Sequence, residues 1–92
     1  MFAMNQPVEM ISVCSEDGSM HPARFRVTDC DGQRITVRVR RVQAMREIKY
    51  VGIEAFQYVC IAILGSRERL IELRYTVRTH CWVLCRFLDM DA

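Results

Sequence analysis

Glycine and proline are scarce in this chain, and their scarcity excludes several kinds of protein. Its 92 residues include four glycines, which stand singly, and two prolines. A phosphate-binding loop needs clustered glycines at fixed spacing, and a flexible linker needs a long tract of glycine, serine or proline. Neither pattern occurs in this sequence. We therefore expect a single domain over residues 1–92, because a chain this short builds one hydrophobic core.

Long apolar runs and an early basic cluster are missing as well. The longest run without a charged residue, residues 55–66, has 12 residues, whereas a membrane-spanning helix needs about 20. Arg24 is the first basic residue, and Glu9 precedes it. A secretion signal, by contrast, opens with positive charge. We expect a cytoplasmic protein with no membrane partner.

The chain has two histidines, and neither completes a catalytic pattern. His80 and Cys81 are neighbours, so on a strand they would point to opposite faces and could not form a nucleophile–base pair. His21 falls in an expected turn. The candidate carboxylates for acid–base chemistry lie in expected turns or at strand ends, where acids usually bond to nearby backbone N–H groups; they are Asp17, Asp29, Asp31 and Glu54. The sequence therefore predicts no enzymatic activity and no catalytic residue.

Five cysteines are present, an odd number without a C-x-x-C pair. Disulfide frameworks use even numbers of cysteines in secreted chains. Cys81 and Cys85 lie four residues apart on an expected strand, which separates them by about 13 Å. That spacing is too long for a shared zinc ion or a disulfide bond. We expect reduced cysteines, no bound metal and no cofactor.

The strongest positive signal is an alternation of apolar and polar residues, which is typical of half-buried strands. In residues 23–28 and 34–40 the apolar side chains fall on one face and the arginines on the other, and Asp31-Gly32 between them predicts a hairpin turn. The expected strands are residues 8–14, 23–28, 34–40, 54–64, 69–77 and 81–88.

Six strands joined by short turns predict an all-β meander of antiparallel strands. We expect it to form a barrel or a strongly bent sheet, because closure removes unpaired edges. The alternation breaks at Arg40 to Val42, which indicates a bulge or the end of the strand. Residues 43–51 favour at most a short helical turn, with Met45 and Ile48 inward. We expect residues 1–7 to form a flexible arm and residues 89–92 a tail.

Both faces of the last strands are apolar, which is more than one buried face requires. If Tyr58 faces the core, we expect an outward apolar face. Its residues are Val59, Ile61, Ile63, Trp82 and Leu84. Residues 43–52, a second sheet layer or a partner subunit could cover it, and these alternatives stay open. A large uncovered apolar patch is uncommon on a soluble monomer, so this face favours a protein partner or a homodimer.

Lysine is nearly absent: Lys49 stands beside twelve arginines, and six arginines fall within residues 24–41. Arginine binds phosphate groups well, although a genome rich in G and C would also raise its frequency. The candidate nucleic-acid face consists of Arg24, Arg26, Arg38, Arg40 and Arg74. Single-strand binding also needs exposed aromatic rings, for which Tyr58 and Trp82 are candidates. A solvated arginine face paired with acids is the alternative.

A weak pattern of residue types extends along most of the chain. It comprises residues 10–14, Asp17-Gly18, residues 22–27, Asp31-Gly32, Val39, Gly52, residues 58–60, 71–75 and 82–84. In order and spacing this pattern resembles a group of small all-β proteins of clostridia and related Firmicutes. The resemblance implies a bacterial, cytoplasmic protein and attaches no activity to any residue. The sequence as a whole predicts a non-catalytic binding module for a protein partner, with nucleic acid as the alternative.

Overall fold

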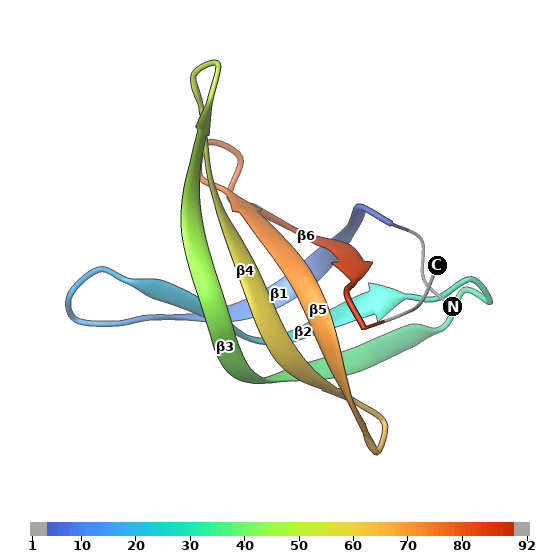
Figure 1. The fold of residues 1–92 in the computed structure, drawn as a ribbon. Helices are drawn as coiled ribbons and strands as arrows, with labels where there is room; N and C mark the ends of the chain where they lie inside the picture. Colours follow the sequence, from blue (N-terminus) through green and yellow to red (C-terminus); the bar gives the residue numbers. More distant parts are fainter. Residues whose placement is uncertain (1–3, 90–92) are drawn as a thin grey trace.

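The computed structural model describes residues 4–89, apart from the side chain of Tyr50. This part of the chain forms six strands and no helix. The strands are β1 (Gln6–Cys14), β2 (Met20–Thr28), β3 (Arg34–Tyr50), β4 (Ile53–Leu64), β5 (Arg67–Thr76) and β6 (Cys81–Phe87). Each strand pairs antiparallel with the next, and β6 pairs with β1 to close a barrel (Figure 1). The predicted all-β antiparallel barrel is confirmed.

No helix within residues 4–89 is long and apolar enough to cross a membrane. Gln6 and Pro7, which the sequence assigns to a flexible arm, are the first residues of β1 and pair with Leu84 and Val83 of β6. That part of the expectation is wrong, because these two residues close the barrel. Residues 1–3 and 90–92, the remainder of the expected arm and tail, lie outside the described residues.

Two short hairpins are built around aspartates, as the Asp-Gly pairs predict. Asp29 Oδ1 accepts hydrogen bonds from the backbone N–H groups of Asp31 and Gln33, each at 2.9 Å. Asp17 Oδ1 accepts from the backbone N–H and the hydroxyl of Ser19. These bonds with Ser19 lower the pKa of Asp17. A carboxylate that bonds to its own turn fixes the turn locally.

The core fills the barrel, and the alternation predicted much of it. Phe25 and Val27 from β2 and Val37 from β3 point inward, as do Ile71 and Leu73 from β5. Three aromatic rings stack beside them, which are Tyr58, Tyr75 and Trp82, with Trp82 at 5.3 Å from Tyr58 and 5.0 Å from Tyr75 between ring centroids. Such tilted contacts add to the stabilisation from burial.

The polar ends of the two buried tyrosines are also bonded. Tyr58 donates its hydroxyl proton to the carbonyl of Met20 at 2.7 Å, and the Tyr75 hydroxyl lies 2.9 Å from Nδ1 of His80. Burial raises the pKa of Tyr58. A buried hydroxyl that keeps a hydrogen-bond partner avoids the free-energy cost of an unsatisfied polar group. Both tyrosines can therefore be buried in the core.

β3 differs from the expectation in its second half. The predicted helical turn over residues 43–51 is wrong, because β3 continues to Tyr50 and pairs with β4 as far as Tyr50 opposite Ile53. The break in alternation does mark bulges, one between Val39 and Arg41 and one between Val42 and Ala44. Beyond them the side chains of residues 43–47 are exposed on both faces. A strand without a buried face shows no apolar period.

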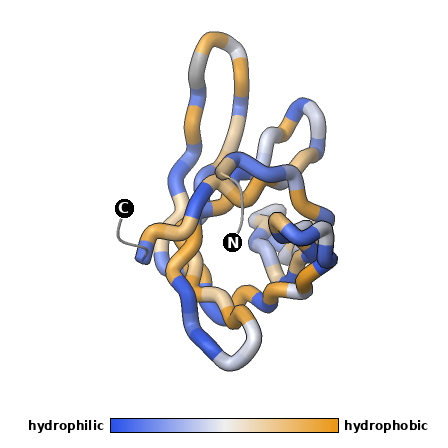
Figure 2. Tube along the Cα trace, turned by 90° about the vertical axis from the view of Figure 1, so that its right-hand side faces the viewer, coloured by the Kyte–Doolittle hydropathy of each residue, from blue (hydrophilic) through white to orange (hydrophobic). Residues whose placement is uncertain are grey.

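This second half of β3 also has an unpaired edge. β2 pairs with β3 only from Arg34 to Arg38, and past Arg38 the described chain gives β3 no neighbour except β4. Figure 1 shows the β3–β4 hairpin rising away from the other strands, and Figure 2 shows it projecting from the rim of the barrel. We call the β3 backbone of residues 39–50, on the side away from β4, the open edge.

Candidate interaction surfaces

An apolar face lies on the outside of the barrel along β4. Val59, Ile61 and Ile63 point outward and are half-buried, and Leu70 of β5 lies directly opposite Ile61. We call these four residues the β4 face. It faces outward because Tyr58, Cys60 and Ala62, which alternate with it, are buried in the core. The structure thus brings together the three β4 residues that the sequence assigned to an interface.

Trp82 and Leu84 do not belong to this face, and the expectation that they share it is wrong. They are 6% and 1% exposed and lie in the core. Their strand is apolar on both faces, so its pattern does not indicate which face is buried. A register shift between Glu72 and Leu73 in the pairing with β6 changes the alternation further, and Cys85 is buried next to Leu84.

A groove of about 320 Å³ continues the β4 face toward β6 and the second half of β3. Its apolar lining comes from Ala44, Met45, Val59 and Leu88, and its polar lining from Arg46, Gln57, Glu72 and Arg86. The polar residues are already paired: Arg86 donates to Glu72 at 3.2 Å, and Arg46 donates to Gln57 at 2.7 Å. An apolar floor with a satisfied polar rim is the arrangement found in protein interfaces.

The predicted arginines are only partly assembled. Arg24 of β2 lies directly opposite Arg38 of β3, and Arg26 lies one rung away opposite Thr36. We call Arg24, Arg26 and Arg38 the arginine face. Arg74 lies on β5, opposite Gln57 and Val83, and is not part of it. The structure therefore groups three of the five predicted arginines and separates Arg40, which lies past the end of the β2–β3 ladder, and Arg74.

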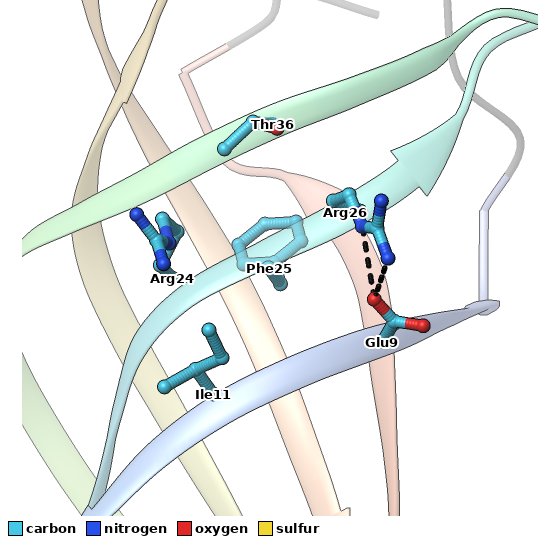
Figure 3. Close-up of a pocket in the computed structure, with 6 residues that line it drawn as sticks. All are labelled: Glu9, Ile11, Arg24, Phe25, Arg26 and Thr36. Atoms are coloured by element: carbon cyan, nitrogen blue, oxygen red, sulfur yellow. Dashed lines mark hydrogen bonds and ion pairs between the residues drawn. The ribbon is translucent and has the colours of Figure 1, made fainter.

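Several of these arginines are paired with acids. Arg26 donates from Nε to Glu9 Oε1 at 2.9 Å, and its hydrogen bond and charge hold the pKa of Glu9 below its usual value (Figure 3). Arg40 forms an ion pair with Glu68. Arg24 and Arg38 make no ion pair and no side-chain hydrogen bond within residues 4–89.

A pocket of about 350 Å³ runs across the arginine face. Figure 3 shows Arg24 and Arg26 on β2 between Ile11 and Glu9 of β1 and Thr36 of β3. Every aromatic side chain that the structure describes is buried or half-buried. Tyr58 and Trp82 are in the core, so the expectation that they could stack on nucleic-acid bases is wrong.

The cysteines provide no cluster for chemistry. Cys81 is exposed and Cys85 is buried, so they do not face one another. Burial raises the pKa of Cys60 to about 12 and also raises the pKa of Cys85. A thiol with such a pKa stays protonated and is a weak nucleophile. Residues 4–89 contain no group of three histidine, cysteine or acidic side chains placed to hold a metal ion.

The tip of the β3–β4 hairpin is a feature that the sequence interpretation missed. Its turn is Val51-Gly52, with φ angles of 48° and 79°. Val51 is 85% exposed, and Met45 and Ile53 on the two strands are also exposed. The signal in the sequence was a pair of residues ending in glycine between two stretches that could form the strands of a hairpin. Valine concealed it, because a β-branched residue rarely adopts a positive φ.

No protein-family model, no curated protein and no solved structure matches this chain.

Proposed function

We propose that this protein is a non-catalytic module that binds another protein through the β4 face, and that its first partner is a second copy of the same chain. The observation that carries the proposal is the outward row of Val59, Ile61 and Ile63. An antiparallel sheet with one buried face normally presents polar residues on the other face. The outward residues of β3 in the barrel, Arg34, Thr36 and Arg38, follow that rule, whereas the β4 row does not.

Association would remove apolar surface from water along this row. Burial contributes about 25 cal/mol for each Å² of apolar surface removed from water. A stable interface needs about 1,000 Å² in total. The groove toward Leu88 and Met45 extends the row and supplies area beyond the β4 face. Arg86 and Glu72 at its rim enter such an interface already bonded to each other.

We place this module in a bacterial cytoplasm. The bacterial origin rests on the resemblance of the sequence pattern. The odd number of cysteines in the chain supports a reducing compartment.

Light scattering on the purified chain, in reducing buffer from about 10 to 500 µM, tests the proposal across the micromolar range. We expect a dimer that is lost in Ile61→Asp, because a carboxylate cannot be buried unpaired in an apolar interface. Ile61→Thr keeps the β-branched shape and checks that any loss does not reflect unfolding. Thr36→Asp, an outward change on the far side of β3, is the matched control. A chain that stays monomeric, or a dimer that Ile61→Asp does not weaken, would overturn the proposal.

Binding of a polyanion through the arginine face is a second candidate. The observation that favours it is the direct opposition of Arg24 and Arg38, neither of which has an acidic partner within the described residues. Like charges directly opposite each other destabilise a sheet, and a bound phosphate would relieve the repulsion. Anisotropy of a labelled single-stranded oligonucleotide tests this. Binding should weaken steeply with salt and disappear in Arg24→Glu/Arg38→Glu but not in Arg74→Glu.

A further inference from the structure

The open edge of β3 carries backbone donors and acceptors that no strand of the described chain uses. The residues of β2 that precede Arg24 pair with β1 alone, and the Tyr58 hydroxyl bonds to the carbonyl of Met20 beyond the end of the β2–β3 ladder. β3 contacts β2 and β4 among the strands and no other strand of residues 4–89. Exposed edges of this kind are templates for pairing with another chain.

Natural edges are protected by bulges and charges, and β3 has its bulges only near the barrel. Both fall between Val39 and Ala44. From Ala44 to Tyr50 the register with β4 is regular and unbroken. The half of the edge toward the tip is therefore the half that a second strand could join without distortion.

The sequence of this regular half complements itself in one register. When two identical strands pair antiparallel about a twofold axis normal to the sheet, residues equally spaced about the axis lie opposite each other. An axis at Ile48 places Glu47 of each copy opposite Lys49 of the other copy. The Ile48 residues of the two copies then lie opposite each other. Axes at Arg46, Glu47 or Lys49 would instead oppose like charges, which destabilises a sheet.

We propose that two copies of this chain pair edge to edge through residues 46–50 of β3, antiparallel about a twofold axis at Ile48. The pairing joins the two barrels by a continuous sheet. It rests on the proposed function, since it names a second copy as the partner, but it uses the edge of β3 and not the β4 face. Glu47 and Lys49, which form an ion pair at 3.2 Å within one chain, would then belong to a cluster of four alternating charges.

The charges give this pairing an unusually specific test. Glu47→Lys places two lysines opposite each other across the axis, and Lys49→Glu places two glutamates opposite each other. We expect each single variant to weaken self-association about tenfold, because two like-charge pairs replace two opposite-charge pairs in every dimer. The double variant Glu47→Lys/Lys49→Glu should associate like the original chain. An equimolar mixture of the two single variants should form a mixed dimer.

Sedimentation velocity at low salt, from about 10 to 500 µM, measures all these species over the range expected of a small interface. Glu16→Lys, in the exposed β1–β2 turn, makes the same change in net charge as Glu47→Lys and is the matched control. Thermal unfolding checks that each variant is folded. Recovery in both the double variant and the mixture supports the pairing, because neither a folding defect nor the net charge would produce it.

Two other results separate this inference from the proposed function. A dimer that ignores every charge variant but dissociates in Ile61→Asp overturns edge pairing and supports the β4 face. A dimer that follows the charge variants and ignores Ile61→Asp supports edge pairing and overturns the use of the β4 face. A chain that is monomeric at all concentrations overturns both. Single variants that weaken the dimer without recovery in the mixture also overturn the edge pairing.

Discussion

The two halves of β3 show what barrel closure contributes to this protein. From Arg34 to Arg38 the strand pairs with β2, β4 joins it at Arg38 opposite Ile63, and Val37 is 3% exposed opposite Phe25. From Ala44 to Tyr50 the same strand pairs with β4 alone, and Met45 is 52% exposed. Both halves are extended strand. Packing against the barrel core, rather than strand formation itself, determines whether a side chain on β3 is buried.

The difference also divides the molecule into regions of unequal local stability. β5 supports β4 as far as Ala55, opposite Thr76, and the Val77 N–H donates to the Glu54 carbonyl, so residues 50–53 at the tip are held by two strands only. Two-stranded ribbons are marginally stable in water. Segments with few buried contacts open more easily than the core, so the tip should open without disturbing the barrel.

Truncating a core side chain of β2 that lies beside the first half of β3 should produce the largest effect. Phe25→Ala removes a ring that is fully buried opposite Val37 and should lower the free energy of unfolding by about 3–5 kcal/mol. Met45→Ala in the open half should change it by less than about 0.5 kcal/mol, as exposed substitutions do. Urea unfolding of the two variants measures both values. Similar decreases in the free energy of unfolding in the two variants would show that the β3–β4 hairpin contributes as much stability as the barrel.

Ionisation of a thiol in the core should have a smaller effect on the free energy of unfolding, and it also distinguishes the core from exposed parts of the chain. Folding raises the pKa of Cys60 from 9.0 to about 12. Between these values the unfolded chain binds fewer protons than the folded chain, so the free energy of unfolding falls as pH rises. The fall is at most about 1.4 kcal/mol for each pH unit, and below pH 9 this thiol adds no pH dependence.

Urea unfolding at pH values of about 8 and about 10, on either side of the ordinary thiol pKa, measures this slope, and Cys60→Ala is the control that removes it. The exposed thiols should behave differently. Iodoacetamide should modify Cys14 and Cys81 in the folded chain, while Cys60 should react only after unfolding. An identical pH slope in Cys60→Ala would assign the effect to other groups.

The smallest effect is expected at the tip. Val51 has a φ of 48°, which costs a β-branched residue about 1–2 kcal/mol, whereas asparagine before glycine suits this turn. Val51→Asn should slow hydrogen exchange about fivefold for those amides of residues 44–50 that bond to β4. Gly52→Ala, at a φ of 79°, should speed it. Unchanged hydrogen exchange in both variants would mean that the turn does not limit opening of the β3–β4 hairpin.

Sequence patterns could predict the strands of the barrel because most of them have one buried and one solvated face. Phe25, Val27, Ile71 and Leu73 all fall on the expected inward side. The open half of β3 could not be predicted in this way, since both its faces are solvated and its residues therefore have no apolar period. Pairing with β4, a contact with a later segment of the chain, is what makes it a strand.

The candidate surfaces were predictable only where a strand kept its alternation. Val59, Ile61 and Ile63 share an unbroken strand, and their common outward face follows from the burial of Tyr58 and Cys60. β6 is apolar on both faces and its register with β5 shifts once. The pattern therefore predicts the wrong side of the sheet for Trp82 and Leu84. The packing of Trp82 between Tyr58 and Tyr75 depends on closure of the barrel.

That position makes Trp82 an internal optical reporter. It is the single tryptophan of the chain, and it lies on the strand that joins the first and last parts of the sheet, opposite Val8 of β1 and Tyr75 of β5. Separation of β1 from β6 would admit water to the indole and move its emission to longer wavelength. Events confined to the distant hairpin would leave the emission unchanged. The molecule thus supplies, without any attached dye, a signal that distinguishes separation of β1 from β6 from motion of the β3–β4 hairpin.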